Sequence, residues 1–421
     1  MVKVDPNIIM QNYENAKIIF KSYGIDTEEV IKEFHSIPIS VHNWQGDDVK
    51  GFEGQQGIHS ENVVTGNYPG ASRNGEEMRN DLDMAFHFSP CKHKLNLHSM
   101  YAEPEVPKER NELTTEDFRK WIDWAKENKI GIDFNVSYFT HPKMLDGCSL
   151  ASPDKETRDY WIKAGIASRK IANDIGKELG ELCVNNTWIP DGTKDLPANR
   201  NLYRQRLIDS LDQIFAEVYD RNYMCDVLEG KVFGIGTECF TVGSHDFYQC
   251  YASQKGIGVT MDTGHYHPLE NVADKISSVY PFVDYIMLHL SRGVRWDSDH
   301  CLIQNDEMLS IMQEIKRQDL FHKNIGIGLD YFDATINRVT AWIIGLRAAG
   351  KAMLTVLLEP TNLLVAAEEK GNLSERLALY DEFKNLPVNA VWDYICFKSD
   401  AGVGIEWLDD IRKYEEVQFI R

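Results

Sequence analysis

The 421-residue sequence contains no uncharged apolar run long enough to span a membrane, because the candidate near 341–359 is interrupted by Arg347 and Lys351. Its opening residues, MVKVDPNIIMQNYENAK, lack the apolar segment of an export signal. None of the eight cysteines belongs to a C-x-x-C pair, so a zinc site built from thiolates is not expected. These absences predict a cytoplasmic protein with reduced thiols and no membrane partner.

Positive charge is also scarce. Lysine and arginine number 45 against 65 aspartates and glutamates, which gives a formal net charge of −20. A field of that sign repels phosphate backbones, so no nucleic-acid partner is expected, whereas a neutral substrate or metal cations are compatible with it. Solubility alone would explain the charge equally well. Hydrophobic residues make up 43% and charged residues 26%, which is typical of a globular chain and excludes a disordered or fibrous one.

Eight short strand-like runs alternate with longer helical patterns. Most of the runs are β-branched or continuously apolar, as parallel strands covered on both faces should be. They span 37–43, 94–100, 130–136, 182–188, 224–229, 256–263, 283–290 and 325–330. The helical patterns cover 76–88, 115–128, 156–177, 200–219, 306–318 and 334–349, and Thr114 with Asp117 predicts a capping box before the second. The alternation predicts an α/β fold, a (β/α)8 TIM barrel.

The predicted barrel leaves an extension at each end. Residues 1–36 are expected to form an N-terminal helical segment and residues 37–351 the catalytic barrel. Residues 352–421 are expected to form a C-terminal helical extension, packed on the barrel or on a neighbouring subunit. The polar, glycine-rich stretch 51–70 follows the first strand, and a loop of that length is usually either disordered or a functional lid.

A polar or aromatic side chain stands at the C-terminal end of every predicted strand, where the active sites of such barrels lie. In chain order these residues are His42 with Trp44, His98, Asn135, Asn186 with Trp188, Glu229, Asp262, His289 and Asp330. Each is weak evidence alone, since a single histidine such as His98 is more often a hydrogen-bonded core residue than a ligand. Their convergence on one face of the barrel predicts a functional site.

The last four strand ends supply Glu229, Asp262, His289 and Asp330. Three carboxylates and one imidazole brought to one point would repel one another strongly without a cation. Oxygen and nitrogen ligands of this kind suit a divalent metal ion. The four residues are therefore predicted to hold one metal ion.

A second group of ligands stands beside the first. His265 follows Asp262 by three residues, and Asp297 and Asp299 are two residues apart, so an extended loop would point both carboxylates the same way. With Asp262 as a bridge, these four side chains predict a second metal ion. In isolation, the D-S-D tripeptide is more often a capped turn.

Charge balance supports two ions per chain. Five ligand carboxylates would face two dications, and Lys231, two residues after Glu229, can supply the missing positive charge. A surface lysine flanking a strand is an equally good interpretation of Lys231. Hard ligands with few histidines and no cysteine favour Mn²⁺, Mg²⁺ or Co²⁺, and Zn²⁺ is also possible.

Eight stretches spread in one order along the chain resemble the L-rhamnose isomerase family, which is related to xylose isomerase. They are VHNWQGDDVKGFE (41–53), TGNYPG (65–70), LNLHSMY (95–101), NTWIPDGTKD (186–195), KVFGIGTECFTVGS (231–244), MDTGHYHP (261–268), RGVRWDSDH (292–300) and IGLDYFDATINR (327–338). The resemblance implies the same barrel with two metals. A substrate-binding metal would be held by Glu229, Asp262, His289 and Asp330, and a catalytic metal by Asp262, His265, Asp297 and Asp299.

The resemblance also implies roles beyond the seven ligands. His98 would lie near the sugar ring oxygen, Trp188 would pack against the sugar, and Lys231 matches a lysine two residues after the first glutamate of the family. Two divalent cations per chain are implied, with Mn²⁺ as the expected ion. The family is typically a homotetramer, and residues 51–70 correspond to a loop that helps to close the site.

The implied reaction is the reversible isomerisation of L-rhamnose to L-rhamnulose in L-rhamnose catabolism. His98 would assist ring opening, and the open sugar would bind at the first metal, beside Glu229. Loss of the O2 proton to Asp330 or to a hydroxide at the metal would permit a hydride shift from C2 to C1. Lys231 would stabilise the charge that develops on O1.

Several alternatives remain open. Proton transfer through a cis-enediol would need a general base over C2, and the sequence nominates no carboxylate beyond the metal ligands. The substrate could be another aldose, such as lyxose, mannose or allose. The same barrel could also carry a binuclear metal hydrolase, a nuclease or a sugar-binding protein. The negative net charge counts against a nuclease, and the complete ligand set counts against a non-catalytic protein.

Overall fold

The computed structural model describes residues 3–53, 66–144, 147–232, 239–294 and 297–421, without the side chains of 297–299. Eight parallel strands close into a barrel in the order β1, β12, β9, β8, β6, β4, β3, β2. Their bounds are β1 Pro38–His42, β2 Lys92–His98, β3 Gly131–Ser137, β4 Cys183–Trp188, β6 Met224–Glu229, β8 Gly258–Asp262, β9 Ile286–Leu290 and β12 Ile325–Leu329. The predicted TIM barrel is confirmed.

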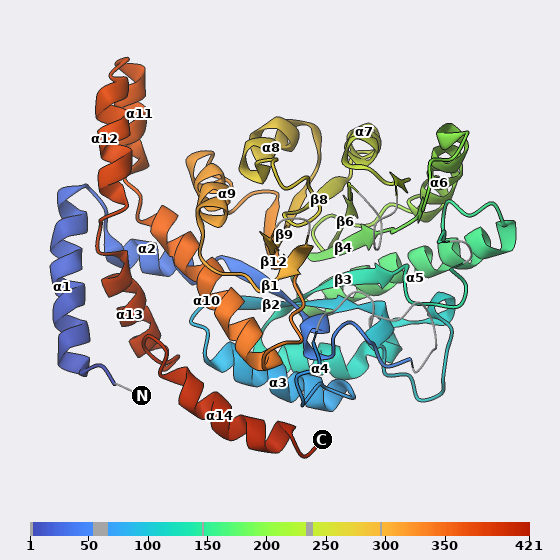
Figure 1. The fold of residues 1–421 in the computed structure, drawn as a ribbon, viewed down its shortest axis with the longest axis horizontal. Helices are drawn as coiled ribbons and strands as arrows, with labels where there is room; N and C mark the ends of the chain where they lie inside the picture. Colours follow the sequence, from blue (N-terminus) through green and yellow to red (C-terminus); the bar gives the residue numbers. More distant parts are fainter. Residues whose placement is uncertain (1–2, 54–65, 145–146, 233–238, 295–296) are drawn as a thin grey trace.

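Helices follow the strands around the barrel (Figure 1). They are α3 Gly75–His87, α4 Arg119–Asn128, α5 Lys155–Leu179, α6 Arg200–Ile214, α7 His245–Lys255, α8 Val272–Val279, α9 Asp306–Arg317 and α10 Arg338–Leu357. Thr114 and Asp117 form the predicted capping box, at the start of a short 3-10 turn that leads into α4. Two small antiparallel pairs accompany the barrel: β5 Gly192–Thr193 with β7 Phe240–Thr241, and β10 Arg292–Val294 with β11 Asp297–His300.

Four helices differ from the prediction. The sequence analysis predicts neither α7 nor α8. In α7 the buried residues Tyr248, Tyr251 and Ala252 form only a weak apolar stripe, whereas α8 has a clear one but is only eight residues long. The helix α6 ends at Ile214 rather than at 219. The helix α10 begins at Arg338, after Asn337 caps its first turn, and continues beyond 349 to Leu357. The boundary predicted at 351–352 therefore lies inside α10.

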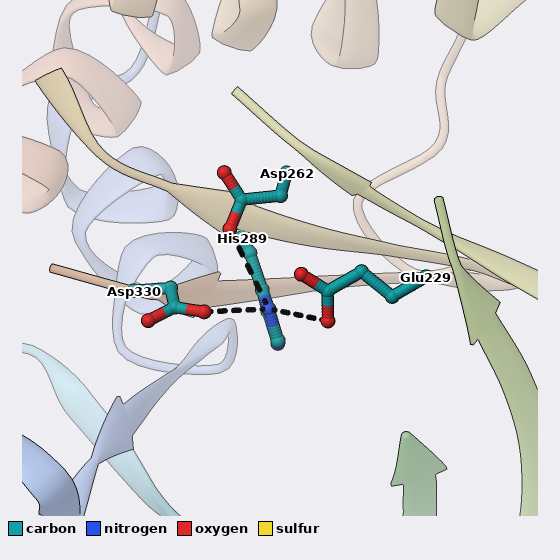
Figure 2. A group of neighbouring side chains, drawn as sticks. All are labelled: Glu229, Asp262, His289 and Asp330. Atoms are coloured by element: carbon teal, nitrogen blue, oxygen red, sulfur yellow. Dashed lines mark ion pairs between the residues drawn. The ribbon is translucent and has the colours of Figure 1, made fainter. Parts of the chain in front are cut away.

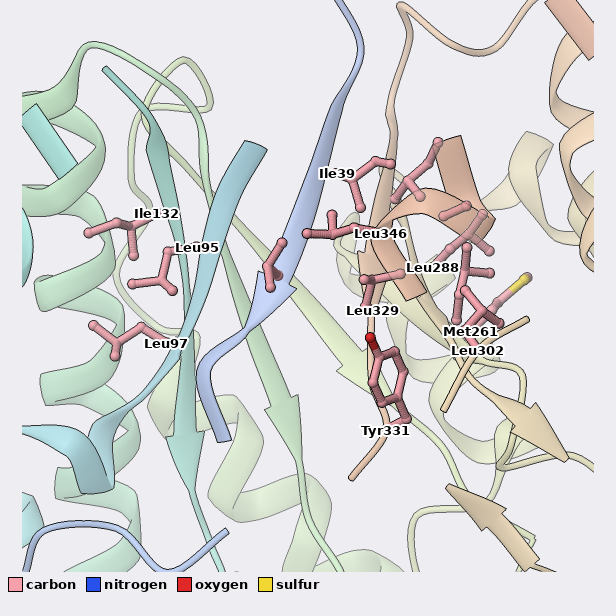
Figure 3. Close-up of a cluster of buried hydrophobic side chains, with 14 of the residues drawn as sticks. Ile39, Leu95, Leu97, Ile132, Met261, Leu288, Leu302, Leu329, Tyr331 and Leu346 are labelled. Atoms are coloured by element: carbon pink, nitrogen blue, oxygen red, sulfur yellow. The ribbon is translucent and has the colours of Figure 1, made fainter. Parts of the chain in front are cut away.

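The outward faces of the strands form the main hydrophobic core. Side chains such as Ile39, Leu95, Ile132 and Leu288 are buried between the barrel and its helices, and Leu346 of α10 is one of their partners (Figure 3). Burial of each such side chain contributes roughly 1.5–3 kcal/mol. The core that holds the barrel together is thus the layer between strands and helices.

The inward faces of the strands are largely polar. Because alternate residues share a face, the inward positions include Ser40, Lys94 and Asp133 near one end of the barrel. A small apolar layer fills the middle: Val184, Cys225, Val227 and Met287. On β12 the inward positions are Gly326 and Gly328, where an added Cβ would lie 2.8 Å from atoms of Met287. Glycine is needed there because Met287 occupies the space.

The two extensions consist of helices that lie together along one flank (Figure 1). They are α1 Pro6–Ser22 and α2 Thr27–Phe34, and α11 Thr361–Glu369, α12 Leu373–Phe383, α13 Val388–Lys398 and α14 Trp407–Gln418. Tyr13 of α1 stacks on Tyr394 of α13 with ring centroids 3.7 Å apart. Arg421 makes a two-pronged ion pair with the fully buried Asp81 of α3. The chain ends are thereby fixed to each other and to the barrel.

The helix α10 is long and apolar enough, by length and composition alone, to cross a membrane. However, 78% of its most apolar window is buried inside the protein. Arg347, in the middle of the helix, donates hydrogen bonds to the carbonyls of Phe88, Ala401, Gly402 and Gly404. Such burial is typical of the central helix of a globular core.

Candidate metal centre

Four predicted ligands meet at the C-terminal mouth of the barrel. Glu229 ends β6, Asp262 ends β8, His289 is the second-to-last residue of β9, and Asp330 directly follows β12. One potential ligand atom of each lies within 4.8 Å of the other three. His289 Nδ1 is central: it is 3.4 Å from Glu229 Oε2, 3.3 Å from Asp330 Oδ2 and 4.0 Å from Asp262 Oδ2 (Figure 2).

Burial and mutual repulsion determine the protonation of this cluster. Burial raises the pKa of Asp262 well above its usual value, and the charges of Asp330 and Glu229 add to that effect. Burial opposes a charge on His289, but the carboxylates of Glu229 and Asp330 outweigh it and raise the pKa of His289 well above its usual value. Without a cation, burial and the neighbouring carboxylates therefore favour the protonated forms of Asp262 and His289.

Two atoms of the cluster are buried without a hydrogen-bond partner among the described residues. They are Asp262 Oδ2 and His289 Nδ1, both of which face the centre of the group. An unsatisfied buried polar atom costs about 1–3 kcal/mol. A divalent cation would satisfy both atoms and replace the retained protons. Carboxylate oxygens and an imidazole nitrogen suit Mn²⁺, Mg²⁺ or Zn²⁺, so the residues present fit a divalent metal ion.

The second predicted metal site is only partly described. His265 Nε2 lies 3.8 Å from Asp262 Oδ2, and His265 Nδ1 lies 3.0 Å from Glu229 Oε1. The strand β11 gives Asp297 and Asp299 the extended backbone that the sequence suggested. Their side chains lie outside the described residues. The structure thus brings His265 to Asp262, and the two further aspartates are placed by their backbone alone.

A row of aromatic rings runs beside the cluster. Ring centroids are 4.5 Å apart for Trp44 and His98, 5.3 Å for His98 and Phe139, 5.2 Å for Phe139 and Trp188, and 5.9 Å for Trp188 and His265. Trp44 Nε1 donates a 2.9 Å hydrogen bond to Asp330 Oδ1, which ties the row to the cluster. The row provides an apolar wall next to the candidate metal ligands.

Lys231 extends over this wall. Its Nζ lies 5.6 Å from the ring centre of Trp188, within range of a cation–π contact. Gly230 precedes it, where an added Cβ would lie 3.0 Å from the backbone of His245. Because Gly230 packs closely against His245, the backbone position of Lys231 after the end of β6 is fixed. Lys231, Trp188 and His98 therefore gather on the same side of the cluster.

Hydrogen bonds define the tautomer of His98. The hydroxyl oxygen of Ser137 accepts the N–H of Met100 and the O–H of Ser99, so its own proton is free to point to His98 Nδ1, 3.0 Å away. The ring proton then resides on Nε2. Burial lowers the pKa of His98 to about 3. His98 is therefore a neutral ring that can donate a hydrogen bond through Nε2, rather than an imidazolium acid.

The whole chain is similar to one known family. A family model described as L-rhamnose isomerase (RhaA) matches residues 7–421. The L-rhamnose isomerase of Rhodopirellula baltica is 48% identical over 408 residues, which cover 97% of this chain and 95% of that protein. The chain belongs to the L-rhamnose isomerase family. The L-rhamnose isomerase of Mannheimia succiniciproducens is likewise 48% identical over 409 residues, covering 97% of this chain and 98% of that protein.

Family membership confirms the resemblance noted in the eight sequence stretches, and the chain is an aldose–ketose isomerase. Among solved structures, an L-ribulose 3-epimerase has a TM-score of 0.47 and 10% identity, covering 76% of this chain and 95% of that chain. That likeness is too distant to carry an argument about the L-rhamnose isomerase site.

Some residues around the L-rhamnose isomerase site escape the sequence analysis. Phe139 lies two residues beyond β3, in a loop without a pattern of its own. Arg110 donates to the carbonyls of Ser137 and Phe139 and forms an ion pair with Glu53, whose Oε2 is 2.7 Å from Nη2. This ion pair spans 57 positions, so no local pattern could reveal it. It holds the segment that carries Phe139 against the site.

Proposed function

We propose that this chain interconverts L-rhamnose and L-rhamnulose in L-rhamnose catabolism, with two divalent cations per chain and Mn²⁺ as the preferred ion. The observation that carries the proposal is the buried cluster of Glu229, Asp262, His289 and Asp330, with two unsatisfied ligand atoms facing its centre. The second cation would be held by Asp262, His265, Asp297 and Asp299. Bound cations would supply Lewis-acid polarisation of the sugar oxygens O1 and O2.

His98 and the aromatic wall would bind and orient the sugar. The neutral ring of His98 can donate from Nε2 to the ring oxygen and so favour ring opening. Trp188 and Phe139 present apolar faces to the carbon skeleton and exclude water from it. The 6-deoxy carbon of L-rhamnose is a methyl group, which suits such a wall.

Lys231 and Asp330 would manage charge during the isomerisation. The ammonium of Lys231 would stabilise negative charge developing on O1. Asp330, held by the indole of Trp44, is the candidate acceptor of the O2 proton. We favour a hydride shift from C2 to C1, because proton transfer through a cis-enediol would need a further base over C2 besides the acceptor of the O2 proton.

We also propose that the enzyme works in the cytoplasm as a homotetramer. None of the eight cysteines, all of which lie among the described residues, forms a disulfide, and six of them are buried, which suits a reducing compartment. Light scattering on the purified protein would measure the mass of the assembly directly. A mass of one or two chains would contradict the tetramer.

The experiment that tests the function is metal-dependent turnover. The protein is stripped with a chelator, and ketose formation from L-rhamnose is measured before and after Mn²⁺ is returned. We expect rhamnulose only with the metal. Turnover of lyxose, mannose or allose in place of L-rhamnose would keep the site and change the substrate. Absence of ketose from every aldose, with Mn²⁺ bound, would contradict the proposal.

A further inference from the structure

A group of buried amides lies beneath the metal cluster. Asn96, Asn135 and Asn186 occupy inward positions of β2, β3 and β4, and Thr260 occupies one of β8. Each is at most 4% exposed. These four residues are here called the amide belt. Bulky apolar side chains normally fill barrel interiors, so four polar side chains at this level require an explanation.

The amide belt is one continuous chain of hydrogen bonds. Thr260 Oγ1 donates to Asn186 Oδ1 at 2.7 Å, and Asn186 Nδ2 donates to Asn135 Oδ1 at 2.9 Å. Asn135 Nδ2 in turn donates to Asn96 Oδ1. Asn135 and Asn186 are direct neighbours in the ladder between β3 and β4, so the register of the strands keeps their amides together.

The amide belt ends on two of the candidate metal ligands. Asn186 Nδ2 also donates to Glu229 Oε2 at 2.6 Å. At the other end, Asn96 Nδ2 lies 3.2 Å from His289 Nε2, the ring nitrogen opposite the Nδ1 that faces the carboxylates. The belt therefore links Glu229 to His289 along a path that avoids the centre of the cluster.

Such contacts have a physical consequence for a metal site. A hydrogen bond to the second ring nitrogen fixes the orientation of a ligating histidine, and one to a carboxylate oxygen fixes the other ligand. Amides do this without adding charge to a cluster that already holds three carboxylates. We propose that the amide belt positions Glu229 and His289 for the divalent cation, and that Asn135 couples them although it hydrogen-bonds to neither. This inference rests on the metal site of the proposed function.

A matched pair of substitutions separates positioning from general stability. Asn135 and Asn185 are both asparagines on adjacent strands, and each is 1% exposed. Asn185 faces away from the cluster, where it accepts from Ser168 Oγ at 2.9 Å and donates to Asp226 at 3.1 Å. Asn135→Leu and Asn185→Leu therefore remove comparable buried amides, and leucine leaves little room for a replacing water molecule.

The measurement is the Kd of Mn²⁺ for the chelator-stripped full-length protein, together with its Tm. We expect both variants to lower the Tm of the stripped protein. Only Asn135→Leu should weaken Mn²⁺ binding, by about tenfold or more, the size typical of losing a group that orients a ligand. Equal Mn²⁺ affinity for the wild type and Asn135→Leu would overturn the proposal.

A second pair keeps the test decisive if Asn135→Leu does not fold. In Asn96→Asp the carboxylate still accepts from Asn135 and replaces Nδ2 with an acceptor opposite His289 Nε2, which carries the ring proton when Nδ1 binds a metal, whereas Asn96→Leu removes both contacts. We expect Asn96→Asp to bind Mn²⁺ at least as tightly as the wild type and Asn96→Leu to bind it about tenfold or more weakly. Equal affinities of the two variants would overturn the positioning role. A wild type that binds no Mn²⁺ would instead contradict the metal site itself.

Discussion

The two ends of the barrel interior both bury charged groups, but in opposite ways. At the N-terminal end, Lys94 Nζ lies 2.5 Å from Asp133 Oδ1 and also donates to the Leu182 carbonyl at 2.8 Å. Asp133 further accepts from Ser40 Oγ at 2.7 Å and from Val184 N–H at 2.9 Å. One positive charge is matched with one negative charge, and each finds hydrogen-bond partners within the protein.

At the C-terminal end the charges are unmatched. Glu229, Asp262 and Asp330 surround the single imidazole of His289, and two buried atoms face the centre without a hydrogen bond to any described residue. A closed network such as the Lys94–Asp133 pair serves the fold. An open network of like charges destabilises the fold, and the cation that we propose for this cluster would offset that cost.

The largest effect on activity is expected from Asp262→Asn, at the C-terminal end of the barrel interior. This change should lower kcat by about a thousandfold or more, because the transition state would lose several kcal/mol of stabilisation by the cation. The metal-free protein should become more stable at neutral pH, because burial raises the pKa of Asp262 and so disfavours its carboxylate in the folded state, whereas asparagine carries no charge. Metal analysis and the Tm of the stripped protein check both effects. Two ions bound per chain at wild-type affinity would contradict the bridging role.

The opposite pattern is expected at the N-terminal end. Lys94→Met should lower the free energy of unfolding by about 3–5 kcal/mol, because it leaves the buried Asp133 carboxylate unpaired. Adding Asp133→Leu should recover much of that loss. Denaturant unfolding measures the free energy of unfolding of the single and the double variant. The kcat per folded molecule should stay near the wild-type value, and a large fall in kcat would show that the two ends are not independent.

Protons should compete with the cation at the C-terminal end. The pKa of His289 and that of Asp262 are both raised in the metal-free cluster, so both protons must leave when a metal binds. Mn²⁺ affinity should therefore fall as pH falls below the raised pKa values of these two groups, by about tenfold per pH unit for each proton released. Calorimetric titration in buffers of different ionisation enthalpy counts these protons. A pH-independent Kd would contradict the predicted protonation.

The smallest effects are expected from removing one buried hydroxyl group at each end of the barrel interior. Ser40→Ala removes the bond to Asp133, and Thr260→Val removes the bond to Asn186. Each should cost about 1 kcal/mol of stability. Only Thr260→Val should also weaken Mn²⁺ binding, because Asn186 holds Glu229. Similar Mn²⁺ affinity in both variants would show that Thr260 does not help to position Glu229, and only the three asparagines of the amide belt would keep that role.

The strands and the cluster could be predicted because both follow short-range rules. A strand in a barrel is a brief apolar run, and its last residue faces the mouth, so Glu229, Asp262, His289 and Asp330 could be assigned to one site from their positions alone. The inward polar positions follow the same rule with a period of two. Asn96 and Thr260 lie two residues before His98 and Asp262, so strict alternation would have indicated both.

Contacts between distant segments could not be predicted in this way. The Arg110–Glu53 ion pair and the contact of Trp44 with Asp330 depend on how loops return to the barrel. The helices α7 and α8 are short, at 11 and 8 residues, so each gives little periodic signal. Gly350 lies inside α10 because it packs against Cys91 and Trp392, where an added Cβ would lie 2.5 Å from Cys91 Sγ.

The central claim is that the unmatched charges at the C-terminal mouth hold a divalent cation. Anomalous X-ray scattering from crystals grown with Mn²⁺ tests it most directly. The account predicts an anomalous peak among Glu229, Asp262, His289 and Asp330, at about 2.0–2.3 Å from one atom of each. A cluster that remains free of anomalous signal, in crystals that catalyse ketose formation from L-rhamnose, would contradict it.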